Sequence, residues 1–237
     1  MNRIVYMCLK NIPRIPSAWF KLCKYAKNPD KYTRKEMADH IRYIMKIAVK
    51  SGNINLKVTG TEMFPKEDGF ILYGNHQGMF DAVAMLAAFD RPLSAVFKKE
   101  LSNIPFAKQV IACTESHAMD REDVRQSMEV ILKTAKDVAE KKKNFVIFPE
   151  GTRSKNGNNM GEFHAGSFKC AQKAKCPIVP FAFIDSYHVL DKDGTDPMDV
   201  QLHFLEPIPY EEYKSLKTPE LAALVKERIQ KVIDENT

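Results

Sequence analysis

One short segment joins a histidine and an aspartate at a spacing that suits acid–base chemistry. His76 and Asp81 lie in the stretch Gly74–Asp81, which follows the apolar run Phe70–Tyr73 and precedes apolar sequence as far as Phe89. This pattern predicts a strand, a tight turn and a helix. On one continuous helix the two side chains would point in different directions, so they can meet only if His76 lies in the turn and Asp81 in the first helical turns. The carboxylate would then accept the imidazole N–H, fix its tautomer and leave the other ring nitrogen free as a base.

A second segment, Phe148–Ser154, brings a carboxylate and a guanidinium to the end of another apolar run. Pro149 ends strand pairing there, and Gly151 frees the backbone to turn. Glu150 and Arg153 are thereby presented at the edge of the predicted sheet, where a planar guanidinium suits a phosphate group. The alternative interpretation is an ordinary turn at the end of a strand, with a solvated ion pair.

The histidine–aspartate spacing by itself has little weight, because the chain holds a second such pair, His188 and Asp193. This copy lies in the polar stretch Asp191–Asp196, which no buried strand precedes. The stretch lacks the regular ligand positions and the terminal glutamate of a calcium loop. We therefore expect a solvated turn here.

The two segments together resemble the 1-acylglycerol-3-phosphate acyltransferase family, within the wider glycerolipid acyltransferases, from about Val58 to Pro209. The matching elements are an Asn-His-x-x-x-x-Asp box (Asn75, His76, Asp81), a complete Phe-Pro-Glu-Gly-Thr-Arg-Ser box (Phe148–Ser154), a Lys-x-Glu-Leu element (Lys98–Leu101) and a Pro-Ile-Val-Pro element (Pro177–Pro180). Gly78 stands where the family usually has serine. Of the block Glu115–Arg121, only the final Asp-Arg pair follows the family pattern.

This resemblance implies transfer of a fatty acyl group from an acyl thioester to the sn-2 hydroxyl of lysophosphatidate, giving phosphatidate in phospholipid biosynthesis. The donor would be acyl-CoA or acyl-carrier protein, acting as a co-substrate and not as a cofactor. His76 is expected to act as the base, and Asp81 to orient it. Neither box contains a serine or cysteine nucleophile candidate in its interior, and Gly-x-Ser-x-Gly is absent, so we expect direct transfer without an acyl-enzyme. Alternatives are another lysophospholipid or glycerol 3-phosphate as acceptor, a hydrolase, and a non-catalytic membrane lipid-binding protein.

The residues expected to bind substrate are Asn75, Lys98, Arg121, Glu150, Gly151, Thr152 and Arg153. Arg153 is the first candidate for the acceptor's phosphate, with Lys98 and Arg121 as helpers or, equally, as members of structural salt bridges. Glu150 would hold Arg153 or bind the glycerol hydroxyl. Asn75 has a structural alternative, a bond to the backbone of the turn. Backbone N–H groups near Gly78 are the expected donors to the oxyanion.

Composition agrees with a globular enzyme, because 44% of the 237 residues are hydrophobic and 28% are charged. The five cysteines form no Cys-x-x-Cys pair and, with the histidines, show no zinc spacing, so we expect reduced thiols and no metal. No stretch reaches about 18 continuous apolar residues, and Lys10, Pro13, Arg14 and Pro16 interrupt the first apolar run. The expected location is cytoplasmic, peripheral at the inner face of the cell membrane.

The basic residues are concentrated at the N-terminus, because residues 1–50 carry 12 Lys and Arg against three acidic residues. Around Trp19 and Phe20 they are interleaved with aromatic and aliphatic side chains, a pattern typical of an element that lies on anionic lipid. Glu36–Lys50 is also amphipathic, and the alternative there is a helix that packs its apolar face on the core. We divide the chain into interfacial helices at 1–50 and an acyltransferase domain at 51–237. No nucleic-acid motif is present.

Alternating apolar runs predict an α/β sandwich with a largely parallel sheet flanked by helices. The expected strands are Asn55–Val58, Phe70–Tyr73, Leu93–Phe97, Ile111–Thr114, Asn144–Phe148, Ile178–Ile184 and Val200–Phe204. The expected helices after the N-terminal element are Phe80–Ala88, Arg121–Lys141, His164–Lys173 and Thr218–Glu235. Both boxes follow strands, so we expect them to face one cleft, with Lys155–Gly161 as a flexible loop able to cover it.

Overall fold

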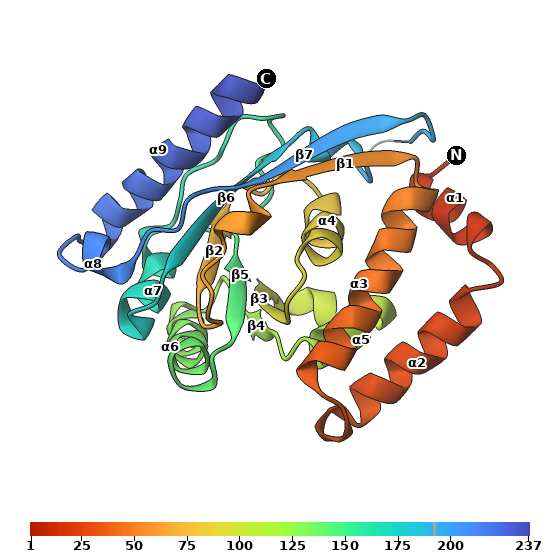
Figure 1. Ribbon diagram of the computed structural model, residues 1–237, viewed down its shortest axis with the longest axis horizontal. Coiled ribbons are helices and arrows are strands. Elements are labelled where there is room, and N and C mark those ends of the chain that lie inside the picture. Colours follow the sequence, from red (N-terminus) through yellow and green to blue (C-terminus); the bar gives the residue numbers. More distant parts are fainter. Residues whose placement is uncertain (192) are drawn as a thin grey trace.

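The computed structural model describes residues 1–191 and 193–237, and its centre is a seven-stranded sheet with the order β1-β7-β6-β2-β5-β3-β4 (Figure 1). The strands are β1 Ile54–Thr59, β2 Ile71–Gly74, β3 Leu93–Lys98, β4 His117–Met119, β5 Asn144–Ile147, β6 Ile178–Ile184 and β7 Met198–Phe204. All neighbouring pairs are parallel except β6 and β7, which are antiparallel. The predicted largely parallel α/β sandwich is confirmed.

Helices cover both faces of this sheet. They are α1 Arg3–Lys10, α2 Ile15–Lys27, α3 Arg34–Ser51, α4 Phe80–Ala88, α5 Pro105–Cys113, α6 Val124–Lys141, α7 Lys169–Ala174, α8 Tyr210–Tyr213 and α9 Thr218–Asn236. In Figure 1, α6, α7 and α9 lie on one side of the sheet, and α4, α3, α5 and α2 lie on the other. The three central strands β2, β5 and β6 are therefore buried on both faces, which is why each is a continuous apolar run.

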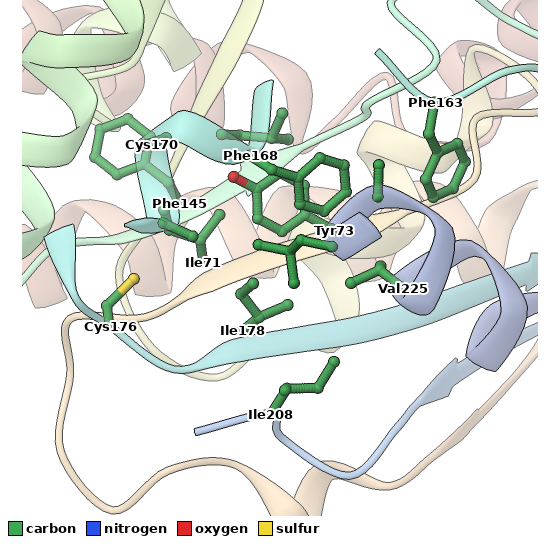
Figure 2. Packing of buried hydrophobic residues seen from close by; sticks show 14 of the residues in the cluster. Ile71, Tyr73, Phe145, Phe163, Phe168, Cys170, Cys176, Ile178, Ile208 and Val225 are labelled. Atoms are coloured by element: carbon green, nitrogen blue, oxygen red, sulfur yellow. The ribbon is translucent and has the colours of Figure 1, made fainter. Parts of the chain in front are cut away.

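The core under α6, α7 and α9 fixes the central strands in place (Figure 2). The rings of Tyr73 on β2 and Phe168 stack with their centroids 4.3 Å apart. The Tyr73 hydroxyl is buried among these side chains and donates a hydrogen bond to the Ser167 carbonyl at 2.9 Å. Every polar group of the ring is thus satisfied, so β2 can deliver the segment that follows it to a fixed position.

Two predicted elements differ from the structure. Ile111–Thr114, expected as a strand, is the end of α5, and the adjacent strand β4 is formed instead by His117–Met119. A short apolar run fits a strand or a buried helix equally well, and here Pro105 at the first helical position starts a helix. The helix expected from His164 begins later, as α7, after a 3₁₀ turn over Ala165–Phe168.

Helix α3 packs into the core. It begins with a capping box between Thr33 and Glu36, and it buries Met37, Ile41 and Met45. These residues share a cluster with side chains of α2, α4 and α5, so the core-packing alternative for Glu36–Lys50 is confirmed. The division of the chain at residue 50 stays a prediction.

Helices α1 and α2 differ from α3, because much of their apolar surface is exposed. The exposed side chains of the two helices are Ile4, Val5, Leu9, Ile15, Trp19 and Phe20, and Ile12 is exposed in the turn between them. Phe20 is 72% exposed, which is unusual for an aromatic residue of this size. Within the described part of the chain, no helix combines the length and apolarity that crossing a membrane requires.

The start of the chain is tied to the loop that leads into β7. The buried Arg3 donates through Nη1 to the carbonyl oxygens of Gly52 at 2.6 Å and Asp196 at 3.0 Å. Close by, the Asn53 side chain donates to the Thr195 carbonyl at 3.0 Å. Helix α1 and the segment before β7 are therefore held to the same end of α3.

Candidate active site

The carboxyl ends of β2, β5 and β6 meet at one edge of the sheet, because these three neighbouring strands are parallel. The segment with His76 leaves β2 there, and the segment with Glu150 and Arg153 leaves β5. Ser186 follows β6 at the same edge. Ligands of parallel α/β sheets bind at such edges. The predicted meeting of the two boxes is thus a direct result of strand order.

His76 and Asp81 form the predicted pair. The imidazole Nδ1 lies 2.7 Å from Asp81 Oδ2, and the carboxylate is fully buried in the first turn of α4. The same oxygen accepts the backbone N–H groups of Gln77 at 2.6 Å and Gly78 at 3.1 Å, while Oδ1 accepts the Ser186 hydroxyl. An ionised carboxylate can only accept, so the neutral form of the ring carries its proton on Nδ1 and a lone pair on Nε2. A ring that is about one-fifth exposed can present that nitrogen to a substrate.

The second box holds His76 through both its ring and its backbone. The ring stacks on Phe148, with centroids 4.3 Å apart. The His76 N–H donates to Glu150 Oε1 at 2.8 Å, and the His76 carbonyl accepts the Ser154 N–H at 2.8 Å. Residues some 70 positions further along the chain therefore hold both the backbone of His76 and one face of its ring, while Asp81 holds Nδ1.

Glu150 does not hold Arg153, so that expectation is wrong. Its Oε1 accepts the His76 N–H, and its Oε2 accepts the Gly161 N–H at 2.9 Å. The side chain is 3% exposed, and burial raises the pKa of this carboxyl although the two N–H donors oppose the rise. Glu150 therefore joins two loops, and its position beneath the surface separates it from the guanidinium.

Arg153 pairs instead with Asp191, across the mouth of the site. Nη1 of Arg153 lies 2.6 Å from Asp191 Oδ1, and Asp191 Oδ2 accepts the Met79 N–H at 3.3 Å. The Asp191 carboxylate therefore bridges the Arg153 guanidinium and the start of α4, on the same edge as His76. Asp191 lies in an exposed turn, as expected for the start of Asp191–Asp196, but its ion pair with Arg153 was not predicted; Lys192 lies outside the described residues. Nothing local in the sequence signals this pair, because its members are 38 residues apart.

Asn75 has the structural role that was the alternative to binding substrate. It is buried, and its side chain accepts the Phe183 N–H at 2.7 Å and donates to the Phe183 carbonyl at 2.8 Å. These bonds attach the segment after β2 to β6. The predicted partner was the backbone of the turn that contains Asn75, so the partner differs although the structural role agrees. The amide is used within the fold, so Asn75 holds the segment that carries His76 in position.

Three polar residues of this edge were not predicted. Gln77 Oε1 accepts the N–H and hydroxyl of Ser186, and Gln77 Nε2 donates to Asn158 at 2.8 Å. Asn158 also bonds Asp185 through both its side-chain oxygen and nitrogen. The Lys155–Gly161 loop, expected to be flexible, is thus anchored to the site by Asn158. Ser186 had one usable signal in the sequence, its place directly after a buried strand.

Backbone N–H groups near Gly78 were expected to bind the oxyanion, and this expectation is wrong for two of them. The N–H groups of Gln77 and Gly78 both donate to Asp81. The N–H of Met79 is next along the chain and is held only by the longer bond to Asp191. It is the backbone donor of this turn that a ligand can most easily engage.

The remaining predicted residues lie along the same edge. Thr152 is exposed beside Arg153, and Gly151 has φ +67°, a conformation that favours glycine. Lys98 ends β3 and lies opposite Met119 of β4, so Arg121 follows nearby. Lys98 pairs with Glu100 at 3.2 Å. Across the described ranges, no ion pair or hydrogen bond joins Lys98 or Arg121 to His76 or Arg153. Strand β5 lies between β3, which carries Lys98, and β2, which leads to His76.

A model of the acyltransferase family matches residues 55–184, a range that contains both boxes. The chain belongs to the acyltransferase family. This membership confirms the family that the sequence predicted and the expectation of an acyl-transferring enzyme. Among the residues described, no group of three His, Cys, Asp or Glu side chains is arranged to hold a metal ion.

Several relatives share the name 1-acyl-sn-glycerol-3-phosphate acyltransferase. A 1-acyl-sn-glycerol-3-phosphate acyltransferase of Borreliella burgdorferi is 26% identical, over 82% of this chain and 78% of that protein. The enzyme of that name from Saccharomyces cerevisiae is 28% identical, over 81% of this chain and 63% of the yeast protein. One from Pseudomonas aeruginosa is 33% identical, but over only 54% of this acyltransferase and 49% of its own length.

The fold agrees with a solved structure along nearly its whole length. The crystal structure of the 1-acyl-sn-glycerophosphate acyltransferase PlsC from Thermotoga maritima superposes with a TM-score of 0.75 at 22% identity. The match covers 97% of each chain.

Proposed function

We propose that this acyltransferase transfers a fatty acyl group from an acyl thioester to the sn-2 hydroxyl of 1-acylglycerol 3-phosphate. The observation that carries the proposal is the His76–Asp81 pair, held at 2.7 Å on the edge that also bears Arg153. A binding protein has no need of an imidazole whose tautomer is fixed in this way. The names of the relatives from Borreliella and yeast support the same acceptor.

In the proposed reaction, Nε2 of His76 accepts the proton of the acceptor hydroxyl. The oxygen attacks the thioester carbonyl carbon, and the resulting tetrahedral intermediate collapses with loss of the thiolate. The imidazolium returns its proton to that thiolate, so His76 ends each cycle neutral. Asp81 lowers the free energy of the imidazolium and keeps Nε2 directed outward, a task for which its buried, four-donor position suits it.

Arg153 is the proposed ligand of the acceptor's phosphate, because it is the partly exposed cation next to the start of α4. Gly151 and Thr152 shape the turn beside it, and Lys98 and Arg121 are the proposed further cations of this edge. Glu150 and Asn75 act as positioning residues through their backbone bonds. Acyl-CoA and acyl-carrier protein are both anionic, so these proposed cations do not favour one donor over the other.

The exposed apolar side chains of α1 and α2 form the proposed contact with an anionic membrane, and the inner face of the cell membrane is the proposed location. Phe20 and Trp19 project from α2, where Lys21 and Lys24 follow. Aromatic side chains enter the headgroup region while lysines attract anionic lipid. This arrangement would bring a lipid acceptor to the enzyme within its own bilayer.

Purified enzyme and a His76→Ala variant, incubated with lysophosphatidate and either acyl donor, would test the proposal by mass spectrometry of the products. We expect phosphatidate from the wild type and a loss of at least about 10³-fold in the variant. Equal binding of both proteins to lysophosphatidate vesicles serves as the control for folding. Free fatty acid without an acceptor would identify a hydrolase instead. Faster transfer to glycerol 3-phosphate or to another lysophospholipid would reassign the acceptor.

A further inference from the structure

The carboxylate of Asp191 occupies the two donors of this edge that suit an anion. Arg153 donates to Oδ1 at 2.6 Å, and the Met79 N–H donates to Oδ2 at 3.3 Å. Met79 immediately precedes α4, so its N–H points out of a helix N-terminus. A guanidinium and a helix N-terminal N–H are groups that hold phosphate in proteins. Asp191 thus makes the contacts that a phosphate would make.

The fold brings this carboxylate close by leaving no side chain at position 78. A Cβ on Gly78 would lie 2.9 Å from Asp191 Oδ2 and 3.1 Å from the Ser186 carbonyl oxygen. The first distance is too short for real atoms, so any larger residue would move the carboxylate away. Ser186 is itself fixed by Gln77 and Asp81. The approach of Asp191 is therefore built into the packing of this edge.

The ion pair between Arg153 and Asp191 is nevertheless weak enough for another anion to displace Asp191. Arg153 and Asp191 are 35% and 33% exposed, and ion pairs of such exposure contribute only about 0–1 kcal/mol. The bond to the Met79 N–H is long. A phosphate monoester carries a charge of about −1.5 to −2 and three acceptor oxygens, against one charge and two oxygens for the carboxylate. It can replace Asp191 at both donors.

We propose that Asp191 is an intramolecular competitor for the phosphate subsite: it holds Arg153 at the mouth of the free enzyme and gives it up to the acceptor's phosphate. This inference rests on the proposed function, in which Arg153 binds that phosphate. Because acceptor and product carry the same phosphate, the competitor weakens the binding of both. It thereby favours release of the product after acyl transfer.

The direct test is calorimetric titration of the full chain with glycerol 3-phosphate, a headgroup that needs no membrane. We expect Asp191→Asn to bind it about three- to fivefold more tightly than the wild type, the factor that corresponds to an exposed ion pair. In an Arg153→Ala background the same substitution should change nothing. The matched control is Asp199→Asn, which removes one charge from a carboxylate that bonds Asn55 and no cation.

Kinetics separate competition from a structural role. Asp191→Asn should lower KM for lysophosphatidate and strengthen inhibition by phosphatidate, whereas a merely structural loss would lower kcat without tightening either lipid. Glycerophosphocholine, a zwitterionic diester, provides a second probe. The competitor model predicts that Asp191→Asn binds it more tightly too. Weaker binding would show that Asp191 holds the cation of a headgroup, and this would overturn the inference.

Two further results would also overturn it. Unchanged or weaker binding of glycerol 3-phosphate by Asp191→Asn would mean that the carboxylate only positions Arg153. Tighter binding that persists in the Arg153→Ala background would mean a general charge effect. The proposed function fails separately: if no lysophospholipid is acylated while Asp191→Asn still tightens phosphate binding through Arg153, the competitor stands and the assigned reaction falls.

Discussion

The backbone N–H of His76 donates to the carboxylate of Glu150 at 2.8 Å, so the second box positions the histidine of the first. Glu150 also holds Gly161, and through it the loop that carries Asn158 to Gln77. One buried carboxylate thus fixes the backbone on both sides of the imidazole. Arg153, in the same box, is partly exposed and pairs with Asp191. Within one short box, one charged residue therefore positions the backbone of His76, while another stays at the surface.

The Glu150→Gln substitution should lower both stability and activity. Glutamine has one side-chain oxygen, so one of the two backbone N–H groups would face an NH₂ group and lose its acceptor. We expect unfolding to become easier by about 1–3 kcal/mol, the cost of an unsatisfied buried group. Thermal denaturation and steady-state kinetics measure the two effects. A variant with wild-type stability and altered acceptor KM alone would show instead that Glu150 binds substrate.

The Asp81→Asn substitution should nearly abolish acyl transfer while the protein still folds. The amide can donate to Nδ1, which would move the ring proton to Nε2 and remove the base. A loss of about 10³–10⁴-fold in kcat is expected by analogy with other histidine–carboxylate pairs. The pH dependence of kcat and circular dichroism distinguish this from unfolding. Activity within tenfold of the wild type would mean that the tautomer is held in some other way.

Replacing Phe20 by serine should weaken attachment to anionic vesicles by about tenfold or more, because burial of a phenylalanine side chain contributes about 1.5–3 kcal/mol. The matched control is Val124→Ser, since Val124 is 80% exposed but lies on α6, outside the N-terminal helices. Sedimentation with vesicles at low and high salt measures both proteins. Equal loss of binding in the two variants would contradict a specific role for α2.

Acidification should destabilise the protein partly through His117. Its ring is 7% exposed, packs 5.2 Å from that of Phe145, and has Nε2 3.2 Å from Asp137. Burial lowers the pKa of His117, and nearby lysines add to this although Asp137 opposes it. The unfolded chain then binds the proton more readily, so this contribution is complete above a pH of about 6.5 and is lost as the pH falls below it.

The His117→Gln substitution isolates that contribution, because glutamine stays neutral and can still donate to Asp137. Between pH 7 and pH 5, the melting temperature of the variant should fall less steeply than that of the wild type. Burial also lowers the pKa values of His40 and His203, so part of the fall should persist. Parallel curves for the two proteins would show that His117 is not a source of the acid sensitivity.

The sequence was a good guide wherever the relevant interaction is local. The strand–turn–helix pattern around His76 predicted its contact with Asp81, because the two are separated by a single turn. The order of the strands in the sheet could not be predicted. The sequence indicated only that both boxes follow strands and so lie at the same edge. The partners of Arg153 and Glu150 could not be predicted, since they depend on how loops from β2, β5 and β6 come together.

Short elements without a clear hydrophobic periodicity could not be predicted from the sequence either. Strand β4 has only three residues, and its apolar neighbour in the sequence is the end of α5. Likewise, the amphipathic pattern of Glu36–Lys50 could not distinguish lipid from core, because both accept the same apolar stripe. The structure decides in favour of the core, since α4 and α5 offer α3 a matching apolar surface.

The bonds of Arg3 have a practical consequence for any study of the N-terminus. Arg3 fastens α1 to Asp196, in the same loop that supplies Asp191 to Arg153. Shortening the chain at its start would therefore detach this loop as well as remove exposed apolar side chains, and a defect in such a truncated enzyme would have two confounded origins. Single replacements on the outer surface of α2 leave that anchor intact, so they can separate recruitment to the bilayer from disturbance of the catalytic edge.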